Sequence, residues 1–289
     1  MRMPCRLEKM YVSLIACFAR HLSFLPTYRV ALLLYPLNSS LFQGFYLIKS
    51  YLKSNYGLKI KLWSKGLIDH KVLFTGTYES DTNIILERYI KSGNVVIEAG
   101  ANIGTETLLL SRLVGHQGKV LAFEPVPNIA NRLAENCRLN GLDNVVLEQL
   151  ALGESNDTIS FFVADETFTN QGMGSKYPVN QHLTKEININ QITLDAYMKS
   201  AVVDSIDFIK MDIQGAELDL LKGGAETISH YLPSIFLEAS EGWSSLSDLY
   251  EWLTDKGYDV FLIQKDTGLT LITCEEIYPG NWFAKPVGM

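Results

Sequence analysis

Long apolar runs, paired cysteines and a secretion signal are all missing from these 289 residues. A membrane-spanning helix needs roughly 20 uninterrupted apolar residues. Here Arg20 and His21 end the run 11–19, and Pro36 interrupts the run 30–37. No small-residue cleavage site follows a clean apolar core, which disfavours a signal peptide. The four cysteines form no C-x-x-C pair and no cluster with the five histidines. We therefore expect a reducing, cytoplasmic location.

Acidic residues are scarce in the first quarter of the chain. Eleven basic residues face only Glu8 and Asp69 up to Lys71, so this part carries a charge of about +9 and the remainder about −16. Apolar and aromatic residues separate these charges, which predicts a basic, mainly helical segment at 1–71 and a globular domain at 72–289. Two interpretations of the segment stay open. It binds peripherally to an anionic membrane face, or it packs on the acidic domain or on a second subunit.

A strand, a tight turn and a helix start follow one another at 94–113, which begins N-V-V-I-E-A-G-A-N-I-G. The β-forming residues end on Glu98, glycines follow at Gly100 and Gly104, and helix-forming residues continue over 105–113. Glycine permits positive φ and lets a ligand approach the backbone, and the first N–H groups of the helix point to the same place. The turn is expected to bind a ligand.

The residues of this turn disfavour a phosphate ligand. A dinucleotide fingerprint has a glycine where this chain has Asn102, which argues against a dehydrogenase. The G-x-x-x-x-G-K-[ST] phosphate loop is also absent from the sequence. Glu98, directly before the turn, would repel phosphate but suits a cationic ligand. S-adenosylmethionine, which carries a sulfonium and an ammonium group, fits that polarity.

Two further acids follow strands that should end at the same edge of a sheet. Glu124 follows the strand 119–123, about 20 positions after Gly104, where an acid can accept both ribose hydroxyls of a nucleoside. Asp212 follows the strand 205–211. That position predicts a carboxylate near the reacting atoms. It would act as a general base, as an orienting group or as a metal ligand, and in the last case the metal would be Mg²⁺.

Strands and helices alternate over the rest of the chain. Expected strands lie at 58–63, 144–150, 157–164, 234–239 and 258–264, and expected helices at 82–91, 128–140, 216–229 and 245–256. Repeated β-α units predict an α/β fold in which a parallel sheet has helices on both faces. Ligands of such sheets bind outside the carboxyl ends of the strands.

Four motifs, in their order and spacing, resemble those of the FkbM family of S-adenosylmethionine-dependent O-methyltransferases. They are I-E-A-G-A-N-I-G at 97–104, A-F-E-P at 122–125, I-T-L-D at 192–195, and K-M-D-I-Q-G-A-E at 210–217 followed by L-L-K-G at 220–223. The upstream G-T-Y-E at 76–79 is similar to the segment that precedes the domain in that family. The resemblance runs from about 76 to 262 and leaves the first seventy residues uncovered.

The resemblance implies a seven-stranded, mostly parallel Rossmann-like sheet in a methyltransferase domain at 72–289. It implies methyl transfer to a hydroxyl of a sugar, a glycan or a related natural product, including acceptors carried on lipid. The expected cofactor-binding residues are Glu98, Gly100, Ala101, Asn102, Gly104, Thr105, Glu124, Pro125 and Asp212. Two positions depart from the family pattern: Glu98 replaces the more frequent Asp, and Gln214 replaces a frequent Glu.

Three residues are candidates for the base that takes the acceptor's proton: Asp212, Glu238 at a strand end, and His182 in a polar insertion. A solvent-exposed role is the alternative for His182. The insertion 168–178 either closes over the substrate or is a mobile connection. In the first case the residues that address the substrate would be Asn170, Gln171, Ser175 and Tyr177.

A second function class remains open from the sequence. The chain would be a membrane-associated nucleoside-binding protein that keeps the sheet and transfers nothing. The presence of Glu98, Glu124 and Asp212 together favours the enzyme. No nucleic-acid partner is expected, and the oligomeric state and the metal requirement stay open.

Overall fold

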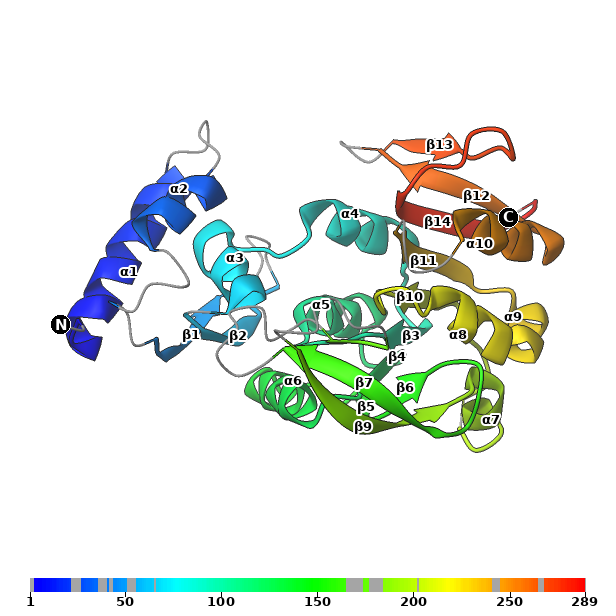
Figure 1. Cartoon of the computed structure of the whole chain (residues 1–289), viewed down its shortest axis with the longest axis horizontal. Helices are drawn as coiled ribbons and strands as arrows, with labels where there is room; N and C mark the ends of the chain where they lie inside the picture. The colour runs from blue at the N-terminus through cyan, green and yellow to red at the C-terminus, as the bar shows by residue number, and fades with distance from the viewer. Residues whose placement is uncertain are drawn as a thin grey trace.

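An eight-stranded sheet forms the centre of the molecule (Figure 1). The computed structural model describes residues 3–21, 27–35, 41, 44–50, 56–64, 66–164, 174–176, 184–201, 203–240, 245–264 and 268–288. The strands of the sheet, in spatial order, are β13 (Leu269–Leu271), β12 (Tyr258–Ile263), β14 (Gly280–Pro286), β11 (Ser234–Ala239), β10 (Phe208–Met211), β3 (Val95–Ala99), β4 (Lys119–Phe123) and β5 (Val145–Glu148).

Most neighbouring strands of this sheet run parallel. The pairs β11–β10, β10–β3, β3–β4 and β4–β5 are parallel, whereas β14 is antiparallel to both of its neighbours and β13 is antiparallel to β12. The predicted seven-stranded, mostly parallel Rossmann-like sheet is confirmed, with the short edge strand β13 as an eighth. Because β3, β4 and β10 are parallel, their carboxyl ends meet at one edge.

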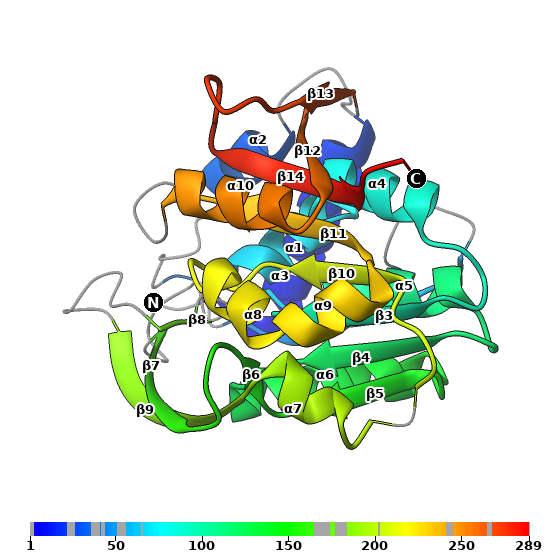
Figure 2. The same ribbon diagram turned by 90° about the vertical axis from the view of Figure 1, so that its right-hand side faces the viewer.

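Helices cover both faces of the sheet (Figure 2). One face packs against α4 (Ser80–Tyr89), α5 (Thr105–Val114) and α6 (Pro127–Leu139). The other packs against α7 (Leu194–Met198), α8 (Glu217–Gly223), α9 (Ala225–Tyr231) and α10 (Leu246–Asp255). Each face therefore has its own apolar core, as expected for a parallel sheet buried on both sides.

Strand alternation decides which face each side chain joins. Val96 and Phe208 belong to the core on the α4–α6 face, whereas Ile97 and Ile209 belong to the core on the opposite face. Successive side chains of a strand point to opposite faces, so Lys210 has the same orientation as Phe208. A lysine therefore lies inside the apolar layer under α4 and α5.

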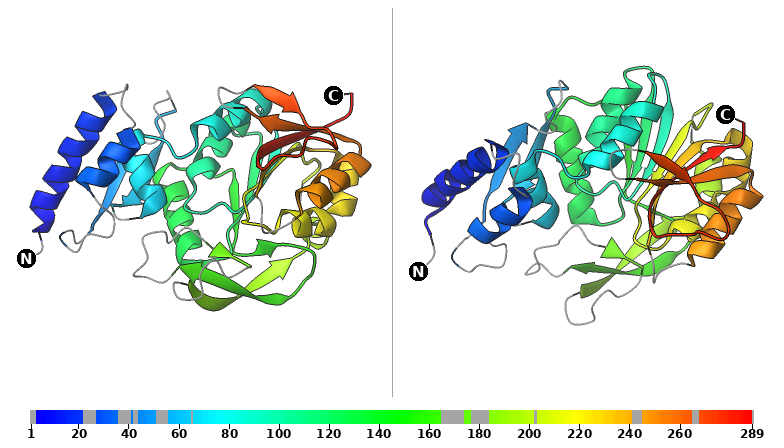
Figure 3. Two further views of the ribbon diagram at one scale, coloured as in Figure 1. Left: turned by 45° about the horizontal axis from the view of Figure 1, so that its top comes forward. Right: turned by 90° about the horizontal axis from the view of Figure 1, so that it is seen from above.

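A second, four-stranded sheet follows β5 and projects beyond the first (Figure 3). Its strands are β6 (Ala151–Leu152), β9 (Thr184–Ile192), β7 (Thr158–Ala164) and β8 (Gly174–Ser175). β7 pairs antiparallel with β9 along its whole length, as expected for a hairpin strand at this point. Of the insertion 168–178, only 174–176 is described. His182, Asn170, Gln171 and Tyr177 lie outside the described residues.

Three predicted elements differ from the structure. The single helix expected at 216–229 is two helices, α8 and α9, separated at Gly224. Gly223, at the end of α8, lies so close to the Gly153 carbonyl that an added Cβ would be 1.9 Å from its oxygen, so a long-range backbone contact places this break. The helix expected from Thr82, with Ser80 or Asp81 as its cap, begins at Ser80 with Glu79 in the cap position. The strand β14 was not predicted.

The N-terminal part is built from α1 (Cys5–His21), α2 (Thr27–Leu34), α3 (Leu67–Thr75) and the antiparallel pair β1 (Tyr46–Ser50) and β2 (Lys59–Trp63). Its apolar core also contains Ile103 of the glycine turn, Leu108 of α5 and Ile129 of α6. One side of this part therefore packs on the central domain. The boundary that we expected at Lys71 falls inside α3, and the division into two domains stays a prediction.

None of the helices in the described ranges combines the length and apolar character needed to cross a bilayer.

A buried acid connects α1, the longest described helix of the N-terminal part, to its neighbours. Glu8 is fully buried and accepts hydrogen bonds from the Tyr35 hydroxyl at 2.5 Å and the Gly44 N–H at 3.0 Å. Burial, and then the hydrogen bond to Glu8, raises the pKa of Tyr35.

A buried ion pair joins α3 to α6. Asp69 pairs with Arg132 and also accepts the Trp63 N–H at 2.7 Å. Replacing Asp69 with Ala leaves both donors without their acceptor, so the free energy of unfolding should fall by about 3–5 kcal/mol. Urea unfolding monitored by circular dichroism measures this loss.

Glu135→Ala is the matched control for that prediction. It removes a more exposed ion pair, between Lys61 and Glu135 at 2.9 Å, that joins β2 to the same helix α6. The cost should be about 1 kcal/mol or less. Equal losses for the two variants would contradict the importance that we assign to the buried pair.

Candidate functional site

The glycine turn between β3 and α5 is shaped by two close packing contacts. Gly100 has φ 79°, and an added Cβ would lie 2.0 Å from the Asp212 carbonyl oxygen. Gly104 has φ 93°, and an added Cβ would lie 2.5 Å from Leu133 of α6. Asn102 lies between them and adopts a left-handed conformation with φ 51°, which asparagine tolerates better than most residues. The first glycine thus brings β3 against the end of β10, and the second brings α5 against α6.

Glu124, directly after β4, fastens this turn. One carboxylate oxygen accepts the Asn102 N–H at 3.0 Å, and the other accepts the Val126 N–H at 2.9 Å. Burial raises the pKa of Glu124 to about 7, against the effect of these two donors, which lower it. Each oxygen keeps a further lone pair that could accept a ligand hydroxyl.

Asp212, directly after β10, lies at the same edge as the turn. Its N–H donates to the Ala99 carbonyl at 3.1 Å, and its side chain is 23% exposed. Gln214 donates to Asp212 at 3.0 Å and to Glu238 at 3.3 Å, so it bridges the two carboxylates. Burial, and then the charge of Asp212, raises the pKa of Glu238 to about 7. The two acids are therefore joined through the amide group of Gln214.

Lys210 lies behind these carboxylates and is 1% exposed. It is the register partner of Glu98 across β10 and β3, and its Nζ is 3.8 Å from a carboxylate oxygen of Asp212. Burial by itself would lower the pKa of Lys210. Four carboxylates outweigh burial and raise it: Asp212, Glu106, Glu98 and Glu79. Lys210 is therefore a buried cation surrounded by acids from β3, α4, α5 and the β10 end.

Two buried carboxylate oxygens near Lys210 have no hydrogen-bond partner among the described residues. One oxygen of Glu98 accepts the Thr107 hydroxyl at 2.6 Å, and the other has no partner. Glu106 is similar: it accepts the Thr105 hydroxyl at 2.6 Å with one oxygen only. Burial raises the pKa of Glu98 to about 8, against the effects of Lys210 and Thr107. Unsatisfied buried acceptors at a turn suit a ligand that brings donors or positive charge.

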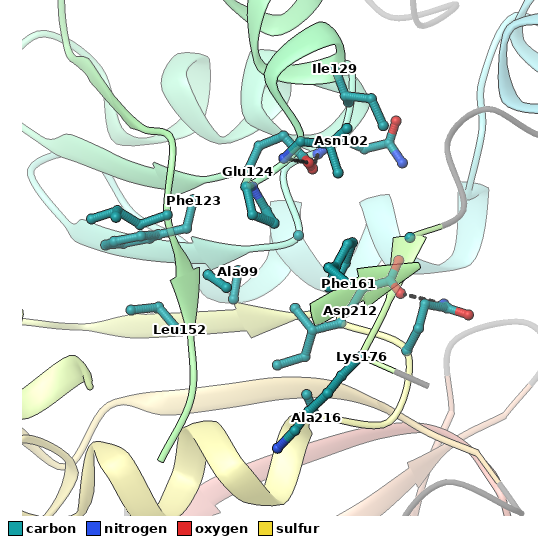
Figure 4. A pocket seen from close by; sticks show the side chains of 18 of the residues that line it. Ala99, Asn102, Phe123, Glu124, Ile129, Leu152, Phe161, Lys176, Asp212 and Ala216 are labelled. Carbon is teal, nitrogen blue, oxygen red and sulfur yellow. Dashed lines mark hydrogen bonds between the residues drawn. The ribbon is translucent and has the colours of Figure 1, made fainter. Parts of the chain in front are cut away.

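A cleft with about 1040 Å³ of empty space opens beside the turn. Figure 4 shows Asn102 and Glu124 on one side of it and Asp212 and Lys176 on the other. One end is apolar, with Phe123 and residues 150–152 along its wall. The cleft therefore combines a polar turn, a carboxylate and an apolar slot.

The residues predicted to bind the cofactor fall into two groups. Those that line the cleft are Gly100, Asn102, Thr105, Glu124, Pro125 and Asp212. Glu98, Ala101 and Gly104 are buried behind the turn and are not part of the lining. Glu98 faces Lys210 because alternation along β3 directs it into the sheet core. Glu238 is also outside the lining and connects to the cleft through Gln214. All of these roles stay predictions.

Sequence analysis did not identify several residues of the site. Tyr78, Glu106, Phe161 and Lys176 line the cleft, and Glu79 lies near Lys210. Signals for some of them were present. Glu79 and Tyr78 belong to the G-T-Y-E segment, Glu106 follows the turn by two residues, and Lys210 is a charge inside an apolar strand.

The described residues contain no group of three or more His, Cys, Asp or Glu side chains arranged to hold a metal ion. Near Asp212, the strongest oxygen donors are already engaged: Gln214 bridges Asp212 and Glu238, and Lys210 approaches Asp212 from behind. A Mg²⁺ site needs several oxygen ligands around one point. The donor set around Asp212 does not fit that requirement, and no step below uses a metal.

Comparisons with known proteins place this site in a family. Residues 98–260 match the model of the Methyltransferase FkbM domain. The 2-O-methyltransferase NoeI of Sinorhizobium fredii is 30% identical over 151 residues, which are 48% of this chain and 60% of NoeI. The hexuronic acid methyltransferase AglP of Haloferax volcanii is 30% identical over 150 residues, which are 50% of this chain and 56% of AglP.

A further relative and a solved structure match this chain at lower identity. Methyltransferase 1 of Beauveria bassiana is 22% identical over 186 residues, which cover 59% of this chain and 74% of that protein. A solved structure of the methyltransferase FkbM from Methylobacillus flagellatus aligns with a TM-score of 0.45 at 20% identity, over 67% of this chain and 44% of that one. Because the family model matches more than half of the chain, this protein belongs to the FkbM family of S-adenosylmethionine-dependent methyltransferases.

Proposed function

We propose that the protein transfers a methyl group from S-adenosylmethionine to a hydroxyl of a sugar or glycan, lipid-carried acceptors included. The observation that carries this proposal is the pair Asp212 and Glu238, bridged by Gln214 at the edge of the cleft. Transfer to oxygen releases a proton from a weakly acidic hydroxyl, and this pair can accept it. The names of NoeI and AglP, one for 2-O-methylation and one for a hexuronic acid, support a sugar hydroxyl as the acceptor.

The residues around the turn fit the cofactor. Glu106 lines the cleft with one unsatisfied oxygen, where an ammonium or sulfonium group would supply the missing positive charge. Glu124 keeps lone pairs for the two ribose hydroxyls, and the apolar wall formed by Phe123 and residues 150–152 suits a planar base. When bound, S-adenosylmethionine supplies an electrophilic methyl group to the cleft.

The acids of the site handle charge and protons during transfer. When the acceptor hydroxyl gives up its proton, that proton would pass to Asp212 or, through the same carboxylate pair, to Glu238. Lys210 places a buried positive charge behind Asp212, with its Nζ 3.8 Å from a carboxylate oxygen of that acid. Alignment by the cleft walls accounts for about 7–11 kcal/mol of barrier in such reactions, and a base for a further 10²–10⁴-fold, roughly.

The acceptor would enter beside the second sheet. Phe161 of β7 presents an aromatic face to the cleft, and Lys176 extends along the same side, where it pairs with Asp219 at 2.7 Å. Ser175 donates to the Gln214 carbonyl at 3.2 Å, so β8 contacts the loop that carries Asp212 and Gln214. The roles that the sequence predicts for the insertion 168–178 and for His182 stay predictions, since of these residues only 174–176 are described.

A protein that binds the nucleoside without transferring a methyl group is the alternative, and a transfer assay separates the two. Incubation with S-adenosylmethionine and a panel of hydroxyl-bearing glycans should increase the mass of one glycan by one methylene unit, read by mass spectrometry. Cofactor binding in calorimetry with no mass gain on any acceptor would favour the binding protein.

A reducing, cytoplasmic location is part of the proposal and rests on the cysteine pattern.

Glu124→Ala should weaken the binding of S-adenosylmethionine and of its demethylated product by about 1.5–3 kcal/mol, because charged hydrogen bonds to the ribose are lost. Isothermal titration calorimetry measures the change. Glu226→Ala, an exposed acid at the start of α9, is the matched control and should leave the affinity unchanged. An unaltered affinity in the Glu124 variant would remove the ribose assignment.

Asp212→Asn should abolish turnover while the cofactor affinity stays within a few-fold, since the asparagine side chain is nearly isosteric with aspartate.

Glu238→Gln should reduce turnover by roughly 10²–10⁴-fold if Glu238 holds the transferred proton. Because a base works in its ionised form and the pKa of Glu238 is raised to about 7, wild-type kcat/KM should rise with pH through that value. The Glu238 variant should lose this rise. A pH profile that keeps the same midpoint in Glu238→Gln would contradict its role.

A further inference from the structure

A row of exposed apolar side chains follows the outer face of α1. Leu7, Met10 and Leu14 are 54%, 58% and 68% exposed. We place each residue at 100° times its residue number around the helix axis. The three side chains then lie at about 280–340°, on one side of the helix. Figure 1 shows α1 at the end of the molecule opposite the C-terminal strands. We call these three residues the outer stripe.

The opposite face of α1 already provides the contacts that the fold needs. Val12, Ile15 and Ala16 are buried in the core that α1 shares with α2 and α3. They lie at about 60–160° around the helix axis, well away from the outer stripe. The stripe is therefore an additional apolar surface. Large aliphatic side chains in a row on a surface commonly mark an interaction site.

Arg6 lies beside this stripe, at about 240° around the α1 axis, and Lys9 lies at about 180°, between Arg6 and the buried face. The one acid of α1, Glu8, is buried. Arg6 and Lys9 are exposed on α1, and Lys9 Nζ also lies 5.5 Å from the centroid of the Phe45 ring. The sequence up to residue 78 contains only two acids, Glu8 and Asp69, and both are buried. The surface of the N-terminal part thus offers positive charge next to apolar side chains.

The helix α2, which packs beside α1, has the same character. Its Leu33 is 82% exposed, the highest value among the large hydrophobic side chains of the described residues, and Arg29 is exposed on the same short helix. Two neighbouring helices, which Figure 3 shows side by side, therefore carry exposed aliphatic and basic side chains.

We propose that the outer stripe, with Arg6 and Lys9, docks on the anionic headgroup region of a membrane. A helix that lies in the interface inserts a narrow aliphatic face and keeps bases at headgroup level. Three side chains cover much less than the about 800 Å² per partner of a typical stable protein interface, which disfavours a second copy of the chain as the occupant. This proposal does not depend on the methyl-transfer reaction.

Co-sedimentation of the full chain with vesicles tests the docking. Vesicles of phosphatidylcholine alone are compared with vesicles that contain about one third phosphatidylglycerol, over a salt series from about 50 to 500 mM. Binding is expected only with the anionic vesicles, and it should weaken as the salt concentration rises. Failure to bind anionic vesicles at the lowest salt concentration would overturn the proposal.

Paired variants locate the binding surface. The triple change Leu7→Ser, Met10→Ser and Leu14→Ser should reduce vesicle affinity at least about tenfold, as should the double change Arg6→Glu and Lys9→Glu. Two controls change the same chemistry elsewhere: Leu271→Ser on β13, and the double change Lys199→Glu and Lys222→Glu at exposed positions of the central domain. The controls should bind like the wild type.

Folding and oligomeric state are measured on every variant, by circular dichroism and by light scattering after gel filtration. Equal loss of binding in controls and stripe variants would assign the attraction to overall charge and overturn the proposal. A wild-type dimer that the triple variant converts to monomer, together with no vesicle binding, would identify a second copy as the occupant. Cofactor affinity, measured in parallel, should be the same in wild type and stripe variants.

Discussion

The burial of Lys210 is the constraint on which the site depends. A lone ammonium group inside an apolar layer would be strongly destabilising, so its place in β10 requires carboxylates on several sides. Glu98 from β3, Glu106 from α5 and Asp212 from the end of β10 supply them. Burial raises the pKa of Glu98 by desolvating the carboxylate, whereas the charge of Lys210 lowers it, so the cation favours the ionised form of this acid. Lys210 thereby links the pairing of β10 with β3, the start of α5 and Asp212 in the cleft.

The glycine turn is shared between two apolar cores. Ile103, between Asn102 and Gly104, packs into the core of the N-terminal part, whereas Ala101 packs into the core under α4–α6. The N-terminal part thus supports the turn from one side and Glu124 fastens it from the other. Of the two interpretations that the sequence left open for the segment, packing on the central domain describes its inner side. The outer stripe lies on the side that this packing leaves exposed.

The edge of the sheet was predictable from the sequence because local rules decide it. Apolar strands that end on Glu98, Glu124 and Asp212 bring these acids to one edge once the strands are parallel, and the glycine spacing identifies the turn. Partners distant in the chain could not be predicted in this way. Lys210 meets Glu98 only because β10 inserts beside β3, and the break between α8 and α9 depends on contact with Gly153.

The direction of Glu98 shows a second limit of sequence reasoning. Its place just before the turn suggested direct contact with a ligand, yet alternation along β3 directs the side chain under α5, where it accepts the Thr107 hydroxyl. The acid that lines the cleft on this side is Glu106, in the first turn of α5 and two residues after Gly104. Motif spacing therefore brought the predicted residues to one cleft but did not distinguish the side chain behind the turn from the one in front of it.

The contact between Gly100 and the Asp212 carbonyl constrains how this enzyme can vary. Any side chain at position 100 would need the backbone that carries Asp212 to retreat, because the added carbon would lie 2.0 Å from its oxygen. Changes at 100 and 212 are therefore not independent, and their effects should not add. A library that seeks new acceptors has more freedom at Phe161 and Lys176, which line the cleft from the second sheet and leave this backbone contact intact.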